Sequence, residues 1–350
     1  MKALRFLIPL VTALVSTGLL AHHGAVTNSA LYNTDEILEL EGELIEILWQ
    51  NPHTRGRLSV VNDAGEETVW EVELGSRPNS LARRGLAAED FLGQVKIAGH
   101  VARRGTYGLG ALHVLLPDGR EIVQGNRSLR WGSEEVASRP AVLDPAKVAA
   151  AREAADGIFR TWSRRQGMNI EPQLRALDLE FTDRGRELNA AYDPLEDNIE
   201  VVECRQGMPD TMFDPVPMEI TNEGDRIIIH IDQYDTRRTV YMDPEAAPAE
   251  PVPSDTGHST GRWDGDTLVV TTTHIGWPYY TEIGMPQTDQ ASYVERFSVS
   301  DGGNRLDYSI VIDDPVVLTE PFTLESFREW TPGVEIPPYN CVISWEDFAG

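Results

Sequence analysis

The sequence is poor in cysteine: Cys204 and Cys341 are the only two in 350 residues. This count leaves no CxxC pair and no zinc-knuckle spacing, so neither a thioredoxin-like redox motif nor a cysteine-based zinc site is predicted. In an oxidising compartment an even pair of cysteines favours a disulfide. We therefore expect a Cys204–Cys341 bridge, which would tie the start of the C-terminal domain to its end.

Basic residues are also scarce, with 30 Lys and Arg against 56 Asp and Glu and a formal net charge of −26. A field of this sign repels phosphate backbones, so we expect no nucleic-acid partner. Walker patterns and dinucleotide-binding glycine fingerprints are absent as well. The acidic residues are spread along the chain, which is typical of a solvated surface and marks no particular cation site.

Long apolar runs are absent except at the N-terminus. Residues 1–21 carry two basic residues, Lys2 and Arg5, before the run and a small residue, Ala21, at its end. This pattern is typical of a cleaved secretory signal; the alternative is an uncleaved anchor, for which the run is short. We expect a periplasmic or secreted protein with no stable membrane span after cleavage.

The remaining sequence predicts a mainly β protein with two domains. In residues 22–125, alternating apolar residues flank a turn at Asp63-Ala64-Gly65, and a short helical pattern at 79–91 interrupts the strands. About five strands with one intervening helix favour a small barrel of the OB type.

Residues 126–200 predict a linker and helices. Asp144 and Pro145 would open one helix running through AKVAAAREAADGIFRTWSRR, and TDRGRELNAAY predicts another. In residues 201–350, turns near 222–225, 264–266 and 301–304 separate alternating strands. Regular hairpins with almost no helix predict an antiparallel, lipocalin-like barrel or half-barrel.

Several sequence strings carry a resemblance to known families. AHHGA, GELIEILWQNPH, VWEVELGSRPNSLARRGL and GHVARRGTYGLGALHVLLPDGREI resemble a family of exported bacterial proteins with an OB-like domain. CRQGMPDTMFDPVPMEI, RRTVYMD, GHSTGRWDGDTLVVTTTHIG, ERF and DDP resemble a widespread family of exported proteins from environmental bacteria. The resemblance implies export and a division into two domains, and it implies no reaction.

Histidines near the predicted cleavage point form a candidate copper site. Cleavage after Ala21 would make His22 the first residue, so that its amine and imidazole chelate one metal ion together. His23 is adjacent, and His53 follows a predicted strand of the same domain; nitrogen-rich square or T-shaped sites favour Cu(II). Cleavage one residue earlier would give Ala-His-His, which also binds Cu(II). The alternative is that the terminal histidines are polar spacing.

The predicted C-terminal barrel holds a second candidate site. If the barrel closes, an acid, a base and anion-binding groups converge near one mouth: the catalytic candidates His258, Arg262, Glu295 and Arg296 and the ligand-binding candidates His230, Tyr234 and Asp235. A histidine near a carboxylate can act as a general base. The alternative is structural, with Asp264-Gly265-Asp266 as a turn and Glu295 and Arg296 as a cross-strand pair.

Two further patterns are weaker indicators. Ser259 in GHSTG matches the letters of a nucleophile elbow, but the string precedes a β-hairpin, so serine hydrolysis is not favoured. Trp277 and Tyr279 would either line a pocket for a small molecule or pack in the core. His100 and His113 are expected to be half-exposed strand residues.

Three functions are consistent with these patterns. We favour a small-ligand-binding or metal-handling protein, with copper as the candidate cofactor. The alternatives are an enzyme that uses His258 as acid or base and an envelope protein whose OB-like face contacts a partner. Convergence of His258, Glu295 and Arg296 on one cavity would favour the enzyme, and an apolar cavity without them would favour ligand carriage.

Overall fold

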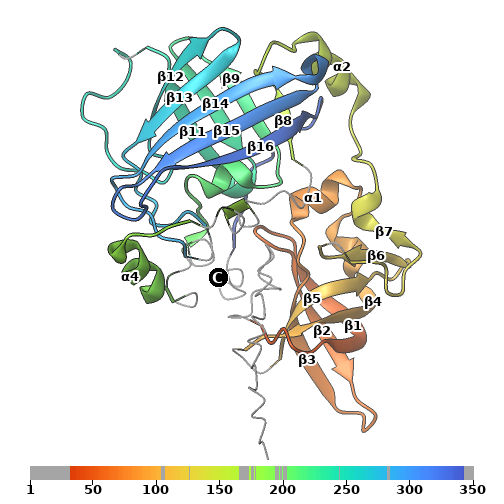
Figure 1. Cartoon of the computed structure of the whole chain (residues 1–350). Coiled ribbons are helices and arrows are strands. Elements are labelled where there is room, and N and C mark those ends of the chain that lie inside the picture. The colour runs from red at the N-terminus through yellow and green to blue at the C-terminus, as the bar shows by residue number, and fades with distance from the viewer. Residues whose placement is uncertain are drawn as a thin grey trace, which may run out of the picture.

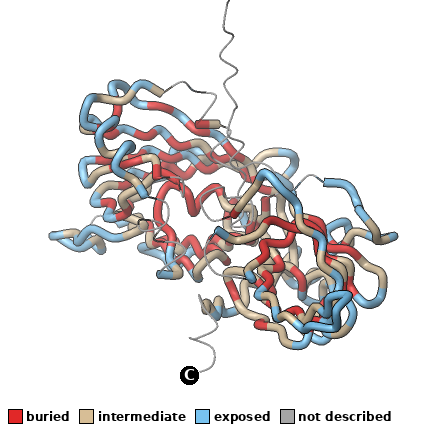
Figure 2. The backbone as a smooth tube through the Cα atoms, turned by 90° about the horizontal axis from the view of Figure 1, so that it is seen from below, coloured by how far each residue is buried: buried red, intermediate tan, exposed pale blue. Residues whose placement is uncertain are grey.

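The computed structural model describes residues 32–342, except for 104–106, 126, 165–172, 175–176, 178, 194–196, 198, 200–202, 244 and 282–283. The described chain forms two β domains, which Figure 1 shows in orange to yellow and in green to blue. Figure 2 shows buried residues along the strands of both domains and exposed residues at the hairpin ends. Among the described residues, no helix is long and apolar enough to cross a membrane.

The N-terminal domain is a small closed barrel. Its elements are β1 (Leu38–Leu48), β2 (Arg55–Val61), β3 (Glu67–Glu73), α1 (Pro78–Arg83), η2 (Ala88–Phe91), β4 (Gly93–Val101), β5 (Gly108–Leu115), β6 (Arg120–Val123) and β7 (Glu134–Glu135). The sheet order is β3-β2-β1-β4-β5-β6-β7, and a parallel pairing of β3 with β5 closes the first five strands into a ring. This closure, with α1 between β3 and β4, confirms the predicted OB-like barrel.

Strand alternation builds the core of this barrel. Leu58 and Val72 are buried, as are Phe91 and Ile97. The β2–β3 hairpin turns at Gly65, where φ is +79°, a conformation that glycine adopts without steric cost. The side chain of Asn62 accepts from the Ala64 and Glu66 amides and fixes the turn.

The segment between the domains is only partly helical. Helix α2 (Pro145–Glu153) begins as predicted, with the Asp144 side chain accepting from the Ala146 amide, and none of its residues is buried. The predicted continuation through residue 165 does not form; β8 (Thr161–Ser163) occupies it and buries Trp162 in the second barrel. Helix α4 (Asp183–Ala191) matches the second predicted helix and is capped by Thr182.

The C-terminal domain is a closed nine-stranded barrel. Together with β8 it contains β9 (Met218–Asn222), β10 (Arg226–Ile231), β11 (Thr236–Tyr241), β12 (His258–Asp264), β13 (Thr267–Thr273), β14 (Ser292–Ser300), β15 (Arg305–Asp313) and β16 (Phe322–Trp330). The closed order is β10-β11-β12-β13-β14-β15-β16-β8-β9. The three predicted hairpins are present, whereas β11 and β12 pair in parallel and depart from a purely antiparallel lipocalin pattern.

Among the described residues, we consider two places where the domains are in contact. At the first, α1 of the small barrel meets η5 (Gln233–Asp235) of the large one: Asn79 Nδ2 and Arg83 Nη2 each lie 3.1 Å from the Asp232 carboxylate. At the second, residues 339–342, here named the C-terminal strap, run beside the loop between β1 and β2. The predicted disulfide between Cys204 and Cys341 is present and anchors this strap.

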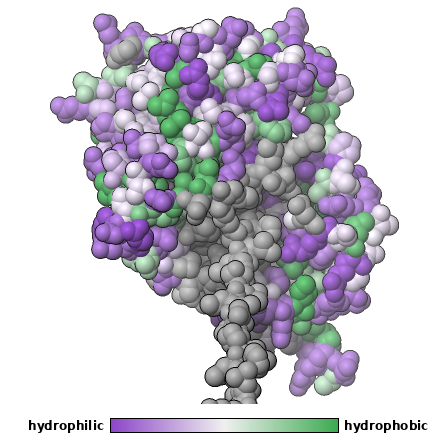
Figure 3. Space-filling view, viewed as in Figure 1, coloured by the Kyte–Doolittle hydropathy of each residue, from purple (hydrophilic) through white to green (hydrophobic). Residues whose placement is uncertain are grey.

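The face of the molecule seen in Figure 3 is mostly hydrophilic. Figure 3 shows polar and charged residues over much of the visible face of both domains, with apolar residues in smaller patches between them. This distribution agrees with the excess of acidic residues in the sequence.

Candidate functional site

His53 lies in the loop between β1 and β2 and is held by a buried carboxylate. Its Nδ1 atom is 2.7 Å from Oε1 of Glu73, the last residue of β3, and Tyr32 donates its hydroxyl to Oε2 of the same carboxylate at 3.0 Å. The His53 side chain keeps 25% of its surface exposed, against 10% for Glu73. An ionised carboxylate only accepts hydrogen bonds, so a neutral His53 that donates to Glu73 would carry its proton on Nδ1 and keep the lone pair on Nε2.

The electrostatics of this cluster favour an ionised Glu73. Burial alone would raise the pKa of Glu73, but His53, Arg55 and the Tyr32 hydroxyl lower it below its ordinary value. Burial and the Glu73 charge in turn raise the pKa of Tyr32, so that its hydroxyl stays a donor. The cluster therefore presents a fixed imidazole whose orientation a charged neighbour sets.

The other copper candidates, His22 and His23, lie outside the described residues. Within the described part of the chain, no group of three or more His, Cys, Asp or Glu side chains is arranged to hold a metal ion. The described residues thus provide one candidate ligand, His53.

A second polar cluster lies inside the C-terminal barrel and is centred on an ion pair that the sequence did not indicate. Both guanidinium Nη atoms of Arg238 in β11 donate to the Glu295 carboxylate of β14, with Nη1 2.7 Å from Oε1. Arg238 also donates to the hydroxyls of Ser259 (3.0 Å) and Thr272 (2.6 Å), and Tyr308 donates to Glu295 at 2.9 Å. Each of these residues is at most 5% exposed.

The alternation of strand residues explains why these side chains meet. Residues at every second position point to one face of a strand, so Ser259 and Thr272, directly opposite each other, share the interior. Ser326 of β16 lies opposite Tyr308 in the same way, and its buried hydroxyl has no partner among the described residues. Together the cluster, here named the barrel polar band, occupies successive strands from β11 to β16: Arg238, Ser259, Thr272, Glu295, Tyr308 and Ser326.

The same alternation separates the predicted catalytic residues. Glu295 points into the barrel, whereas Arg296 points out and forms an ion pair with Asp264 at 3.1 Å, with both side chains about half exposed. His258 precedes the interior Ser259 and lies on the outer face, where it stacks on Tyr241 at a centroid distance of 5.5 Å. Burial and the nearby His274 lower the pKa of His258. The structure thus does not bring His258, Glu295 and Arg296 together, and Arg262 is an exposed residue of β12.

The predicted ligand-binding residues gather near the domain junction. His230 lies opposite the exposed Arg237, on the outer face of the barrel, with its Nε2 2.5 Å from Oδ1 of Asp235. Tyr234 packs against Tyr339 of the C-terminal strap at a centroid distance of 5.3 Å. These three side chains therefore lie outside the barrel interior.

The two aromatic candidates pack against neighbouring segments. Trp277 is 3% exposed, and Gly207 lies so close that a Cβ atom there would be 2.2 Å from the indole. Tyr279 contacts the ring of Tyr192 at a centroid distance of 5.0 Å. Trp277 is therefore a core residue.

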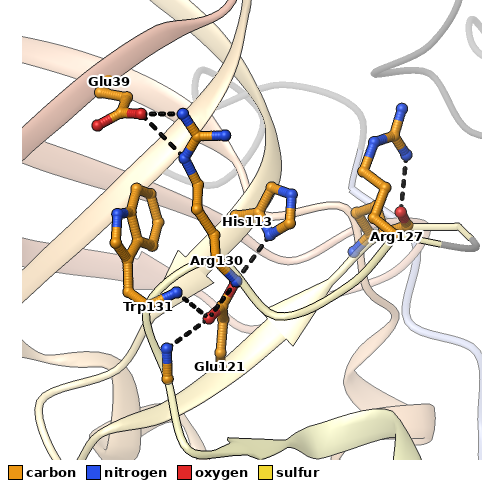
Figure 4. A network of polar contacts seen from close by, with 8 residues as sticks. Glu39, His113, Glu121, Arg127, Arg130 and Trp131 are labelled. Carbon is orange, nitrogen blue, oxygen red and sulfur yellow. Dashed lines mark hydrogen bonds and ion pairs between the residues drawn. The ribbon is translucent and has the colours of Figure 1, made fainter.

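Figure 4 shows a further buried carboxylate, Glu121 of β6, in the N-terminal domain. It accepts from the backbone amides of Arg130 (3.0 Å), Trp131 (2.9 Å) and Gly132 (2.6 Å), and its Oε1 lies 2.7 Å from Nδ1 of His113. Burial alone would raise the pKa of Glu121, but these donors lower it below its ordinary value. The carboxylate pins residues 130–132 to the barrel, and the prediction that His113 is half exposed is wrong, since it is 6% exposed.

A comparison with known protein families finds a match in the N-terminal part of the chain. The model of a family of unknown function (DUF6152) matches residues 11–109, a stretch that contains His22, His23 and His53. No curated protein matches the chain.

Proposed function

We propose that this chain is an exported copper-binding protein in which His53 and the histidines freed by signal cleavage, His22 and His23, ligate the metal. The observation that supports the proposal is the contact of 2.7 Å between His53 Nδ1 and Glu73. Metal-binding histidines commonly donate their second ring nitrogen to a carboxylate, which fixes the tautomer and raises the basicity of the ligating nitrogen. Nε2 of His53 is left as the metal-binding atom.

The start of the described chain supports the same site. Tyr32 is bound to Glu73, the carboxylate that holds His53. Residues 24–31 separate His23 from Tyr32 and span at most about 30 Å when extended. The terminal histidines are therefore tethered within reach of His53.

The donor set favours copper over other divalent ions. A terminal amine with three imidazole groups supplies nitrogen atoms, which suit square or T-shaped Cu(II) coordination. The strongly acidic chain, with a net charge of −26, adds a long-range attraction for cations.

The test uses protein that has been exported and processed by its host. Intact mass fixes the N-terminus, and copper titration with EPR then compares wild type with His22→Ala and His53→Ala. We expect one Cu(II) per chain with an axial, nitrogen-rich spectrum, weakened at least about tenfold by either substitution. His274→Ala, which removes an exposed histidine from the other domain, serves as the matched control. Sub-stoichiometric copper, or a site that His53→Ala leaves unchanged, would contradict the proposal.

A second function is supported by the barrel polar band: binding of a small uncharged molecule inside the C-terminal barrel. Barrels of about this strand number either fill their interior with side chains or hold one small ligand. The charges of Arg238 and Glu295 neutralise each other, while the Ser326 hydroxyl leaves one buried group without a described partner. His258 lies on the outer face beside Tyr241 and away from Glu295, which favours ligand binding over acid-base chemistry by His258 in this barrel.

Native mass spectrometry tests this second function on the purified protein. We expect a small-molecule adduct on wild type that is lost in Ser326→Phe, because the larger side chain fills the interior. Thr323→Phe places the same ring on the outer face of the same strand and should keep the adduct. A wild-type protein that carries no adduct after gentle purification would argue against ligand carriage.

A further inference from the structure

The C-terminal strap binds the two domains alternately along its length. The Tyr339 ring contacts Tyr234 of the C-terminal barrel. The Asn340 carbonyl accepts from the Asn51 amide at 3.0 Å, and the Val342 amide donates to the Asn51 carbonyl at 2.8 Å. Cys341 lies between them and is bonded to Cys204. The side chains of Tyr339 and Cys341 contact the C-terminal domain while the strap backbone bonds to Asn51, so the strap contacts both domains at once.

Cys204 is itself fixed on the large barrel. The next residue, Arg205, forms an ion pair with Asp255 at 2.9 Å, and Gly207 packs against the buried Trp277. The disulfide therefore connects the strap to a firmly packed part of the C-terminal domain.

The strap is hydrogen-bonded to the loop that carries His53. Both backbone groups of Asn51 bond to the strap, while on the other side of His53 the Thr54 backbone pairs with Ser76 and Leu74 at 2.9 and 2.8 Å. Pro52 has no amide hydrogen to give. The backbone on one side of His53 is thus bonded to its own barrel at Thr54. The backbone on the other side is bonded, at Asn51, to the strap that the disulfide holds.

We propose that the Cys204–Cys341 disulfide is a positioning element of the His53 metal site. This inference rests on the proposed copper function and adds to it the feature on which the geometry of the site depends. Ordering the strap residues costs conformational entropy, and the covalent link to Cys204 offsets part of that cost by holding the strap on the C-terminal barrel. Without the disulfide the strap leaves Asn51, and the imidazole loses its fixed distance to Glu73.

Two variants test the positioning role by different routes. Cys204→Ser with Cys341→Ser removes the covalent anchor without leaving thiols that would bind copper themselves. Val342→Pro keeps the disulfide but removes the amide that donates to Asn51, and Val342→Ala, which retains that amide, is its control. Near-UV circular dichroism of the buried tryptophans is the control that checks whether each variant keeps its folded barrels.

Two measurements are made on natively processed protein. In copper titrations, we expect both test variants to bind Cu(II) about tenfold more weakly, with a broadened EPR spectrum, and Val342→Ala to match wild type. In metal-free protein, the ring ¹⁵N shifts of His53 report its tautomer. We expect the Nδ1-protonated form in wild type and in Val342→Ala, and a mixture of tautomers in the two test variants.

The outcomes separate this inference from the copper function. If wild type binds no copper, the proposed function fails, and the tautomer measurement alone decides whether the disulfide positions His53. If the His53 tautomer, and any copper affinity, are the same in wild type and in both test variants, the disulfide has no positioning role and the inference is overturned.

Discussion

Arg237 and Arg238 are neighbours with the same side chain and opposite surroundings. Arg238 is 1% exposed and bound to Glu295, whereas Arg237 lies on the outer face of β11. The alternating pattern of β11 predicts that adjacent residues face opposite sides, but it does not tell which arginine faces inward. That choice depends on the partner carboxylate, which lies on β14 and is brought close only by the closed sheet.

Replacement of Arg238 by methionine should strongly destabilise the C-terminal barrel. Glu295 would remain buried with its charge uncompensated, and breaking a buried pair in this way costs about 3–5 kcal/mol. The measurement is urea unfolding followed by tryptophan fluorescence. Arg237→Met is the matched control and should change the free energy of unfolding by less than about 0.5 kcal/mol. Equal effects of the two substitutions would show that the ion pair does not contribute.

His53, the candidate metal ligand, shows how much of the site can be predicted from residue patterns. His53 is singled out by the sequence because it follows a predicted strand in the domain that begins with two histidines. Its partners, Glu73 and Tyr32, are not, since they occupy ordinary positions of a strand and of an N-terminal stretch. Their role appears only when β3 and the beginning of the chain meet at the same loop.

At the scale of elements, most strands follow from local patterns, and β8 does not. Helix formers from residue 146 onward predict a helix through residue 165, yet α2 ends at Glu153 and the chain turns at Gly157, where φ is +47°. Trp162 then packs in the barrel core, and the strand that carries it pairs with β16 and β9. Burying the Trp162 side chain stabilises the fold by more than the helix propensity that a few residues lose when they leave the helix. Tertiary packing therefore outweighs helix propensity in this segment.

The closure of both barrels also lies beyond local patterns. Hairpins are predicted by their turns. The pairing of β3 with β5 joins strands that are not consecutive, and the pairing of β11 with β12 joins consecutive strands in parallel, so neither has a hairpin turn. Such pairings depend on the whole sheet and leave no signal in a short window of sequence. They decide which side chains face an interior, and hence the barrel polar band.

At the scale of the whole molecule, the two domains are joined by polar contacts as well as by the strap. Asp232 is 2% exposed and accepts from Asn79 and Arg83 across the junction. Burial lowers the pKa of Arg83, the nearby Arg77 adds to this lowering, and the Asp232 carboxylate opposes it. We therefore expect the junction to couple the stability of the two barrels.

Asp232→Ala should uncouple the domains. Arg83 would lose its ion-pair partner, at a cost of about 1–3 kcal/mol, and we expect calorimetry to resolve two unfolding transitions where wild type shows one. Glu325→Ala, which removes an exposed carboxylate from the outer face of β16, should leave the wild-type profile. An unchanged single transition in Asp232→Ala would show that the Asp232 contacts are not needed to couple the domains.

The strap also sets an order of events in biosynthesis. Ribosomes make protein from the N-terminus, so the OB-like barrel can form while the second barrel is still being translated. The loop that carries His53 nevertheless waits for residues 340–342, which are made only after all the strands of both barrels. A chain interrupted before that point would present an imidazole held on one side only, by the pairing of Thr54 with Ser76 and Leu74.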